Sequence, residues 1–411
     1  MGRERRPRLS IRGAIAPGLL ATLVLLAACA RESSRGPSPG TAPDPEGAAA
    51  AGRNVDPSLD LLVSRTAGLT RAGASPAAWE AEPEWKAYAE LAGRDWASFL
   101  AAVLEPMKAW AGVELREARR STTSLFYPFG GPDFVTSDCL FPEASTTVLM
   151  GLEPVGNLPD LDGASAAWRA AFFADMGELV SGFLRRGYFI TREMNDVYSR
   201  GKVDGALPVI AFFLGRGGYG IIEISRLVPG TNGSWTETPY VPMAVRPHRP
   251  YGVKIVCRKP GAAADRTVYY FSCDVENKAF RTDGPLYRFM AGLDRMTTFV
   301  KSGSYLLHWD NFSTLRGFIL ERSRFVLQDD TAVPYRFFKA PGWQVRLFGR
   351  YGTPVKDFTN VEQPDLREAY EDPETGVEPL PFHFGYHWRT QLDNLLLAKR
   401  SRRAYKVPVS R

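Results

Sequence analysis

The sequence predicts a mixed α/β or α+β fold, in which helices flank a mixed sheet, with a helical subdomain on its N-terminal side. Three observations support this class. Strand-like and helix-like segments alternate through residues 121–398, and apolar residues recur at helical spacing through residues 79–110. The third is composition: 411 residues, of which 45% are hydrophobic and 23% charged, can bury a large core. This composition excludes a disordered tail and a multi-span membrane protein.

Residues 1–28 have the layout of a secretory signal peptide. Five arginines and one acid, Glu4, occupy the first twelve residues, and an apolar segment runs from Leu19 to Ala28. This segment is shorter than the roughly 20 apolar residues that a membrane-spanning helix needs. We therefore expect residues 1–28 to direct export.

The apolar segment ends in Leu26-Ala27-Ala28-Cys29, which resembles the lipobox of bacterial lipoproteins. The resemblance implies cleavage before Cys29 and acylation of this cysteine, for example with palmitate, so that the lipid membrane is one expected partner. Ala30, in place of aspartate, implies sorting to the outer membrane. We expect the protein in the bacterial cell envelope, on the periplasmic or the surface face of that membrane.

The next residues, 29–58, are rich in Ala, Gly, Pro and Ser and predict a disordered tether. Apolar and aromatic residues at helical spacing, from Trp79 to Trp110, predict a helical subdomain over 59–120. A mixed α/β domain over 121–398 and a basic tail over 399–411 complete the chain.

The sequence predicts a succession of short strands and helices over residues 121–398. Expected strands are 124–129, 146–152, 221–228, 253–257, 268–273, 325–327, 335–338 and 344–348. Expected helices are 134–141, one capped by Ser165, one capped by Asp283, one capped by Asn311, and 391–399. The strands 253–257 and 268–273 are expected to pair as a hairpin around Pro260-Gly261.

Three segments of this region resemble segments of hypothetical bacterial lipoproteins: 127–134 (YPFGGPDF), 151–156 (GLEPVG) and 328–334 (QDDTAVP). The resemblance covers much of residues 120–400. It implies no activity and no functional residues.

Two motifs are interpreted as turns. Residues 215–220 have the spacing G-x-G-x-x-G, but the β-branched, alternating segment that follows predicts a strand where a dinucleotide fingerprint requires a helix. Asp160-Leu161-Asp162-Gly163 resembles the start of a calcium loop, yet Ala171 stands where the closing glutamate belongs.

The candidate catalytic residues are Ser302, Ser304, His308, Asp329 and Asp330. A hydroxyl near an imidazole and a carboxylate is the set that nucleophilic catalysis uses, although its members usually come from distant parts of a chain. A polar strand and turn is the competing interpretation for 301–310, and a solvated turn is the competing interpretation for the two aspartates.

His383 and His387 are four residues apart, a spacing that suits a metal only on a helix. The alternating aromatic residues around them predict an extended segment, which would separate them by about 13 Å. The sequence therefore predicts no metal site and no cofactor.

Three cysteines remain after lipidation of Cys29: Cys139, Cys257 and Cys273. In the expected hairpin Cys257 faces about residue 267, too far from Cys273 for a disulfide. We expect these two cysteines to be unbridged.

The net charge of +6 arises at the ends of the chain. Residues 1–28 contribute +4 and residues 399–411 another six positive charges, so residues 29–398 sum to −4. This distribution removes the argument for a nucleic-acid partner. The sequence favours a lipoprotein that binds or supports an envelope protein or polymer; the alternative is a hydrolase acting on an envelope polymer or ester.

Overall fold

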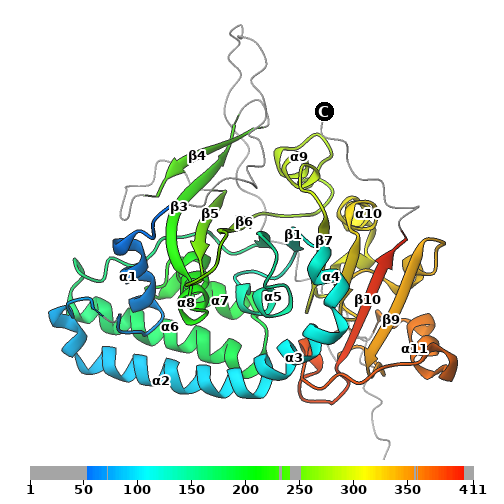
Figure 1. Cartoon of the computed structure of the whole chain (residues 1–411), viewed down its shortest axis with the longest axis horizontal. Coiled ribbons are helices and arrows are strands. Elements are labelled where there is room, and N and C mark those ends of the chain that lie inside the picture. Colours follow the sequence, from blue (N-terminus) through cyan, green and yellow to red (C-terminus); the bar gives the residue numbers. More distant parts are fainter. Residues whose placement is uncertain are drawn as a thin grey trace, which may run out of the picture. The chain divides into compact units, whose positions relative to one another are not determined.

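The protein is an α/β protein built on one mixed sheet. The computed structural model describes residues 53–71, 73–230, 234–240, 251–355, 358 and 360–401. Within these residues ten strands form a single sheet with helices around it, which confirms the predicted class (Figure 1). Cys29, the predicted signal peptide and most of the predicted tether lie outside the described residues. Among those described, none of the helices has both the length and the hydropathy to cross a bilayer.

The centre of the sheet is parallel. In spatial order the parallel strands are β6 (Arg266–Ser272), β2 (Thr146–Gly151), β1 (Ser124–Tyr127), β7 (Met296–Val300) and β8 (Phe325–Gln328). Every residue of β1, β7 and β8 is buried. Parallel strands are covered on both faces, which explains why these segments lack the alternation of a half-exposed strand.

Antiparallel strands flank this centre on both sides. Beyond β6 lie β5 (Gly252–Arg258), β3 (Gly220–Pro229) and β4 (Trp235–Pro239); beyond β8 lie β10 (Asn394–Arg400) and β9 (Trp343–Gly349).

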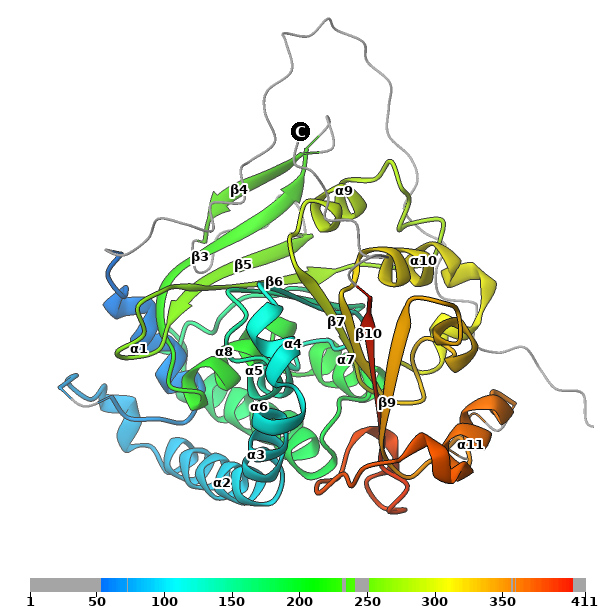
Figure 2. The ribbon, with the colours of Figure 1, turned by 45° about the vertical axis from the view of Figure 1, so that its right-hand side comes forward.

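Helices cover both faces of the sheet (Figure 2). One face packs against α1 (Pro57–Thr66), α2 (Pro83–Phe99), α3 (Glu105–Glu114), α4 (Arg116–Ser121), α5 (Phe134–Leu140), α6 (Ala166–Arg186), α7 (Thr191–Arg200) and α8 (Ala206–Arg216). The other packs against α9 (Pro285–Ala291), α10 (Ser313–Arg322) and α11 (Pro364–Glu371). Neighbouring residues of β1 divide accordingly, with Leu125 and Tyr127 in the first core and Phe126 in the second.

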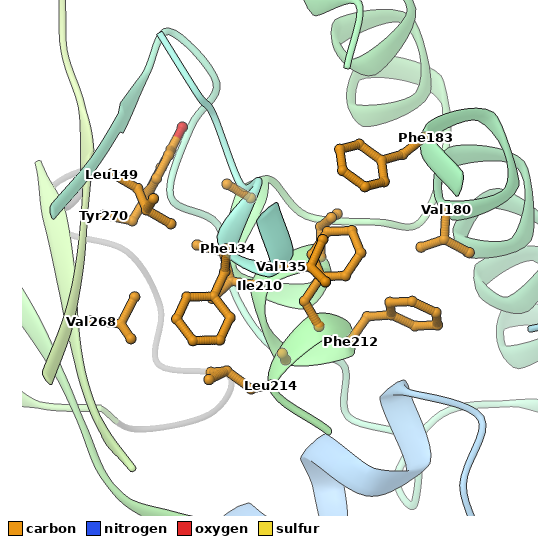
Figure 3. Close-up of a cluster of buried hydrophobic side chains, with 14 of the residues drawn as sticks. Phe134, Val135, Leu149, Val180, Phe183, Ile210, Phe212, Leu214, Val268 and Tyr270 are labelled. Carbon is orange, nitrogen blue, oxygen red and sulfur yellow. The ribbon is translucent and has the colours of Figure 1, made fainter. Parts of the chain in front are cut away.

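The first core joins the predicted helical subdomain to the sheet. In Figure 3, Phe134, Ile210 and Leu214 lie between the strand residue Val268 and the α6 residue Phe183. Residues 59–120 are helical as predicted, and their buried side chains belong to this same core. They are one layer of the domain that contains the sheet.

The folded region begins before the predicted end of the tether. The N–H of Asp56 donates to the carbonyl of Ile221 in β3, and the Asp56 side chain caps α1. At the other end, Lys399 and Arg400 belong to β10, so the predicted tail begins too early; residues 402–411 lie outside the described residues.

Most predicted elements are confirmed. Ser165 caps α6, and residues 217–219 form the predicted turn, here between helix α8 and strand β3. The N–H of Gly163 donates to the Asp160 side chain in the other predicted turn. The hairpin β5–β6 pairs Cys257 with Arg266, one residue from the expected position. Cys257 and Cys273 are not bridged to each other, as predicted, and Cys139 is also free.

Two predicted elements and two predicted caps are wrong. Residues 335–338 form a 3-10 helix, and the helix expected at 391–399 is strand β10. The residue before α9 is Gly284, and α10 begins after Phe312, where the side chain of Asn277 accepts the N–H of Thr314. A side chain far away in sequence therefore supplies the cap that Asn311 was expected to provide.

Candidate functional site

The carboxyl ends of β1 and β7 lie at a topological switch point of the sheet. The chain leaves β1 toward β2 on one side, whereas it leaves β7 toward β8 on the other. In open α/β sheets this divergence opens a crevice where ligands bind. The loops that follow β1, β2, β7 and β8 therefore define the candidate site.

The three segments that resemble hypothetical lipoproteins all fall at this edge. Residues 127–134 begin at the last residue of β1, residues 151–156 at the last residue of β2, and residues 328–334 at the last residue of β8. The parallel strands thus bring together segments that are far apart in sequence.

A buried ion pair joins the loops after β1 and β7. Lys301 Nζ lies 2.6 Å from Asp133 Oδ2, and the two side chains are 3% and 2% exposed. The ammonium group also donates to Thr136 Oγ1 and to the carbonyl of Gly187, while Tyr127 donates its hydroxyl to Asp133. With three acceptors around it, Lys301 fixes the two loops in place.

The Asp329 carboxylate ties the loop after β8 to the loop after β7. It accepts the N–H of Ser302 at 2.8 Å and the N–H and hydroxyl of Thr331. Burial and the neighbouring charge of Asp330 raise the pKa of Asp329 to about 6. This carboxyl group therefore changes its charge close to neutral pH.

The Asp330 carboxylate faces a different set of groups. It accepts hydrogen bonds from Tyr305 at 2.5 Å and from Asn394 at 3.0 Å, and His387 Nε2 lies 3.5 Å from it. Burial lowers the pKa of His387, but the interaction with the nearby Asp330 carboxylate outweighs this effect, so the net shift of the pKa is upward. Asp330 thus connects the loops after β7 and β8 to the segment before β10.

A third buried carboxyl group, Glu153, follows β2. Burial raises its pKa. A Cβ atom on Gly151 would stand 2.3 Å from Glu153 Oε2 and 3.0 Å from the Cα of Gly131. Glycines in both loops therefore allow this side chain to lie between them.

Several residues at this edge have left-handed backbone conformations without being glycine. Phe129 after β1 has φ = 62°, and Ser302, Ser304 and Tyr305 after β7 have φ of 55°, 51° and 55°. Each such residue costs about 1–3 kcal/mol, and such residues cluster at functional sites. The loop after β7 is therefore held in a strained conformation by its surroundings.

The two serines of this loop differ in their hydrogen bonds. Tyr386 donates its hydroxyl to the Ser302 carbonyl, so its contact with Ser304 Oγ at 2.8 Å makes Ser304 the donor there. Ser302 Oγ is buried and has no hydrogen-bond partner among the described residues.

Aromatic rings line the partly exposed side of this loop. The Tyr386 ring is perpendicular to Tyr188 at a centroid distance of 4.9 Å and nearly parallel to Phe358 at 6.1 Å. We call Tyr188, Tyr386, Phe358, Ser302 and Ser304 the rim; all five are partly exposed.

A cavity of about 10 Å³ also lies beside the two aspartates, lined by residues that include Gln363, Tyr370 and Asn394. This volume suits one water molecule. An organic ligand would therefore contact the rim.

The candidate residues from the sequence are brought together only in part. Ser302 contacts Asp329, and Asp330 is the next residue, but neither serine hydroxyl is hydrogen-bonded to His308. Burial and the charge of Arg336 lower the pKa of His308 to about 4, so it is neutral at pH 7. The structure therefore holds no serine–histidine pair among these residues.

Four residues of the site were not predicted from the sequence, Asp133, Lys301, Tyr386 and Asn394, and His387 was considered only as a metal ligand. Their positions could have identified Asp133 and Lys301, because both lie in loops that follow buried strands. However, β7 was not predicted as a strand. His383 is hydrogen-bonded to Asp393, whereas His387 lies beside Asp330, so the two histidines do not face one common site. In the part of the chain that the structure describes, no three His, Cys, Asp or Glu side chains are grouped to hold a metal ion.

No protein-family model matches the chain, and neither does any of the curated proteins or solved structures compared with it.

Proposed function

We propose that this chain is a lipid-anchored protein of the bacterial cell envelope whose α/β domain binds a small polar ligand at the carboxyl edge of its parallel strands. The anchor is supported by the signal-peptide layout of residues 1–28 and by the lipobox that ends at Cys29. The binding function is supported by one observation above all: the loops after four neighbouring strands meet at the switch point and place buried, polar side chains there.

The chemistry of the edge favours a ligand with hydroxyl or ammonium groups. Asp329 and Asp330 lie buried beside the rim, where their negative charge favours an ammonium group, while the rim hydroxyls of Ser304 and Tyr386 can form hydrogen bonds with ligand hydroxyl groups. The rings of Tyr188, Tyr386 and Phe358 supply an apolar surface beside them. Amino sugars and peptides of the envelope combine both properties, so we infer a ligand of this class.

The anchor is tested by metabolic labelling with radioactive palmitate. The wild-type protein should incorporate the label and Cys29→Ala should not, while Cys139→Ala, which removes another thiol, should be labelled like the wild type. Unchanged labelling of Cys29→Ala would contradict the anchor.

Ligand binding is tested by thermal unfolding of the mature protein in detergent. The probes are glucosamine, N-acetylglucosamine, muramyl dipeptide and diaminopimelate, each at millimolar concentration. At least one should raise the Tm of the wild type, and Tyr386→Phe, which removes a rim hydroxyl, should weaken that effect. Ser121→Ala is the matched control, because Ser121 precedes β1 at the opposite edge of the sheet. No shift with any probe would count against this ligand class.

A further inference from the structure

The hydroxyl of Ser302 is one of the buried groups at the carboxyl edge that have no hydrogen-bond partner among the described residues. Both of its backbone polar groups are used, since the N–H donates to Asp329 and the carbonyl accepts from Tyr386. Its Oγ atom is buried without a partner among the described residues, whereas Ser304 Oγ, two residues away, is bonded. An unsatisfied buried polar group costs about 1–3 kcal/mol of folding stability, so we expect the Ser302 hydroxyl to have a function.

The backbone places this hydroxyl as a nucleophile is placed in other α/β proteins. Ser302 is the second residue after the parallel strand β7 and has φ = 55°. A serine on a sharp, strained turn at the carboxyl end of a strand is the geometry of a nucleophile elbow. Here the turn leads into a 3-10 helix, and the G-x-S-x-G motif is absent from the sequence around Ser302. The resemblance is therefore one of local geometry.

Two contacts hold the turn in this conformation. On one side of Ser302, the Lys301 ammonium is fixed by Asp133. On the other side, Gly303 donates its N–H to Thr331 Oγ1 at 2.6 Å. These contacts connect the turn to the loops after β1 and β8, which maintains the strained conformation without a ligand.

Asp329 is the base available to this hydroxyl. Its Oδ2 atom accepts the N–H of Ser302 itself, so the carboxylate lies beside the serine. Gly385 packs against both groups: a Cβ atom there would stand 2.5 Å from Asp329 Oδ2 and 3.5 Å from Ser302 Oγ. The absence of a side chain at Gly385 therefore allows the hydroxyl and the carboxylate to lie on the same side of this segment.

We propose that Ser302 is the nucleophile, and Asp329 its general base, in the hydrolysis of a carboxylic ester at this edge. The substrate would be an ester of the hydroxyl-bearing ligand class inferred above, so this inference rests on the proposed function for its substrate. Catalysis then uses Ser302 and Asp329 in place of the serine–histidine pair expected from the sequence.

The reaction has two steps, formation of an acyl-serine and its hydrolysis. Ser302 Oγ bonds to the carbonyl carbon while its proton passes to Asp329, and the bond to the alcohol oxygen then breaks as that oxygen takes the proton from Asp329. Water attacks the acyl-serine, gives a proton to Asp329 and displaces Ser302 Oγ, which recovers the proton. The sum is ester plus water giving carboxylic acid plus alcohol.

The groups around Asp329 set its protonation. Asp330 lies beside it, Tyr305 belongs to the loop after β7, Tyr127 to the end of β1 and Tyr370 to α11, while Tyr386 and His387 precede β10. The pKa of each of these tyrosines is raised by burial, so they stay neutral near pH 7. Asp329 itself has a pKa of about 6, which makes it a base above that pH.

The test uses the mature full-length protein and a fluorophosphonate probe. Attack by Ser302 forms an Oγ–P bond and releases fluoride, so labelling requires a nucleophilic serine and no natural ligand. We expect one adduct, located on Ser302 by peptide mapping. Ser302→Ala should lose it, and Ser121→Ala should keep it. The labelling rate should rise about tenfold per pH unit below pH 6 and level off above, because only ionised Asp329 accepts the proton.

The role of Asp329 is tested separately. Asp329→Asn should reduce the labelling rate at least tenfold, and circular dichroism shows whether the variant keeps its fold. If it does not fold, the pH profile of the wild type tests the base. No adduct, an adduct on another residue, or a rate that does not change between pH 5 and 8 would overturn the proposal. None of these results would affect the test of ligand binding by Tm.

Discussion

Replacing Lys301 with methionine should destabilise the domain severely, because it leaves a buried carboxylate without its cation. Lys301 and Asp133 are 3% and 2% exposed, and their charged atoms are 2.6 Å apart. Removing one partner of such a pair costs about 3–5 kcal/mol. The side chain of methionine fills most of the lysine volume, so the loss is electrostatic rather than a cavity effect. Since whole domains are stable by only about 5–15 kcal/mol, the loss should be large in any unfolding assay.

The assay is urea unfolding followed by circular dichroism, with a double variant as the internal test. Lys301→Met combined with Asp133→Asn removes both charges and should recover much of the lost stability, because the remaining groups are neutral. Arg281→Ala is the control: Arg281 pairs with Asp283 at the surface, and its loss should leave the midpoint unchanged. The reasoning is refuted if Lys301→Met costs less than about 1 kcal/mol, or if the double variant is less stable than the single one.

Three further predictions concern the same domain. Gly156→Ala should lower the free energy of unfolding by at least about 2 kcal/mol, because φ is 72° and a Cβ there would overlap the carbonyl of Asp204; a midpoint within error of the wild type would contradict this. Asp329→Asn should be less sensitive to pH than the wild type. The pKa of Asp329 in the folded protein, about 6, exceeds the ordinary aspartate value of about 3.9, so the wild type should lose about 2 kcal/mol relative to the variant as pH rises from 4 to 6. Equal pH dependence of the two proteins would exclude the raised pKa. Finally, three thiols should react with Ellman's reagent in the unfolded protein, because Cys139, Cys257 and Cys273 are free and the proposed lipid would block Cys29; one thiol would indicate a disulfide, and four an unmodified Cys29.

The sequence predicted local structure best where periodicity or turn chemistry is strong. The cap at Ser165, the hairpin β5–β6 and the first two strands of the parallel centre are examples. The segment of β10 was interpreted as a helix because Leu395–Ala398 is a short apolar run, and such a run fits a buried strand and a helix equally well. Its place between β8 and β9 is decided by tertiary packing.

The candidate site was predicted only in part for a related reason. Ser302, Asp329 and Asp330 were selected for their chemistry, but their partners come from segments whose proximity depends on strand order. β7 was missed because Met296–Val300 contains two threonines and does not alternate, although all five residues are buried. Without β7 between β1 and β8, the switch point could not be located, and neither could the pair of Lys301 with Asp133.

We propose that the protein binds its ligand at the carboxyl edge of the parallel strands. Hydrogen–deuterium exchange of the mature protein tests it most directly, with and without a mixture of glucosamine, N-acetylglucosamine and muramyl dipeptide. We expect slower exchange confined to residues 128–133, 301–305 and 384–391. Protection at the opposite edge of the sheet, or no protection at all, would contradict it.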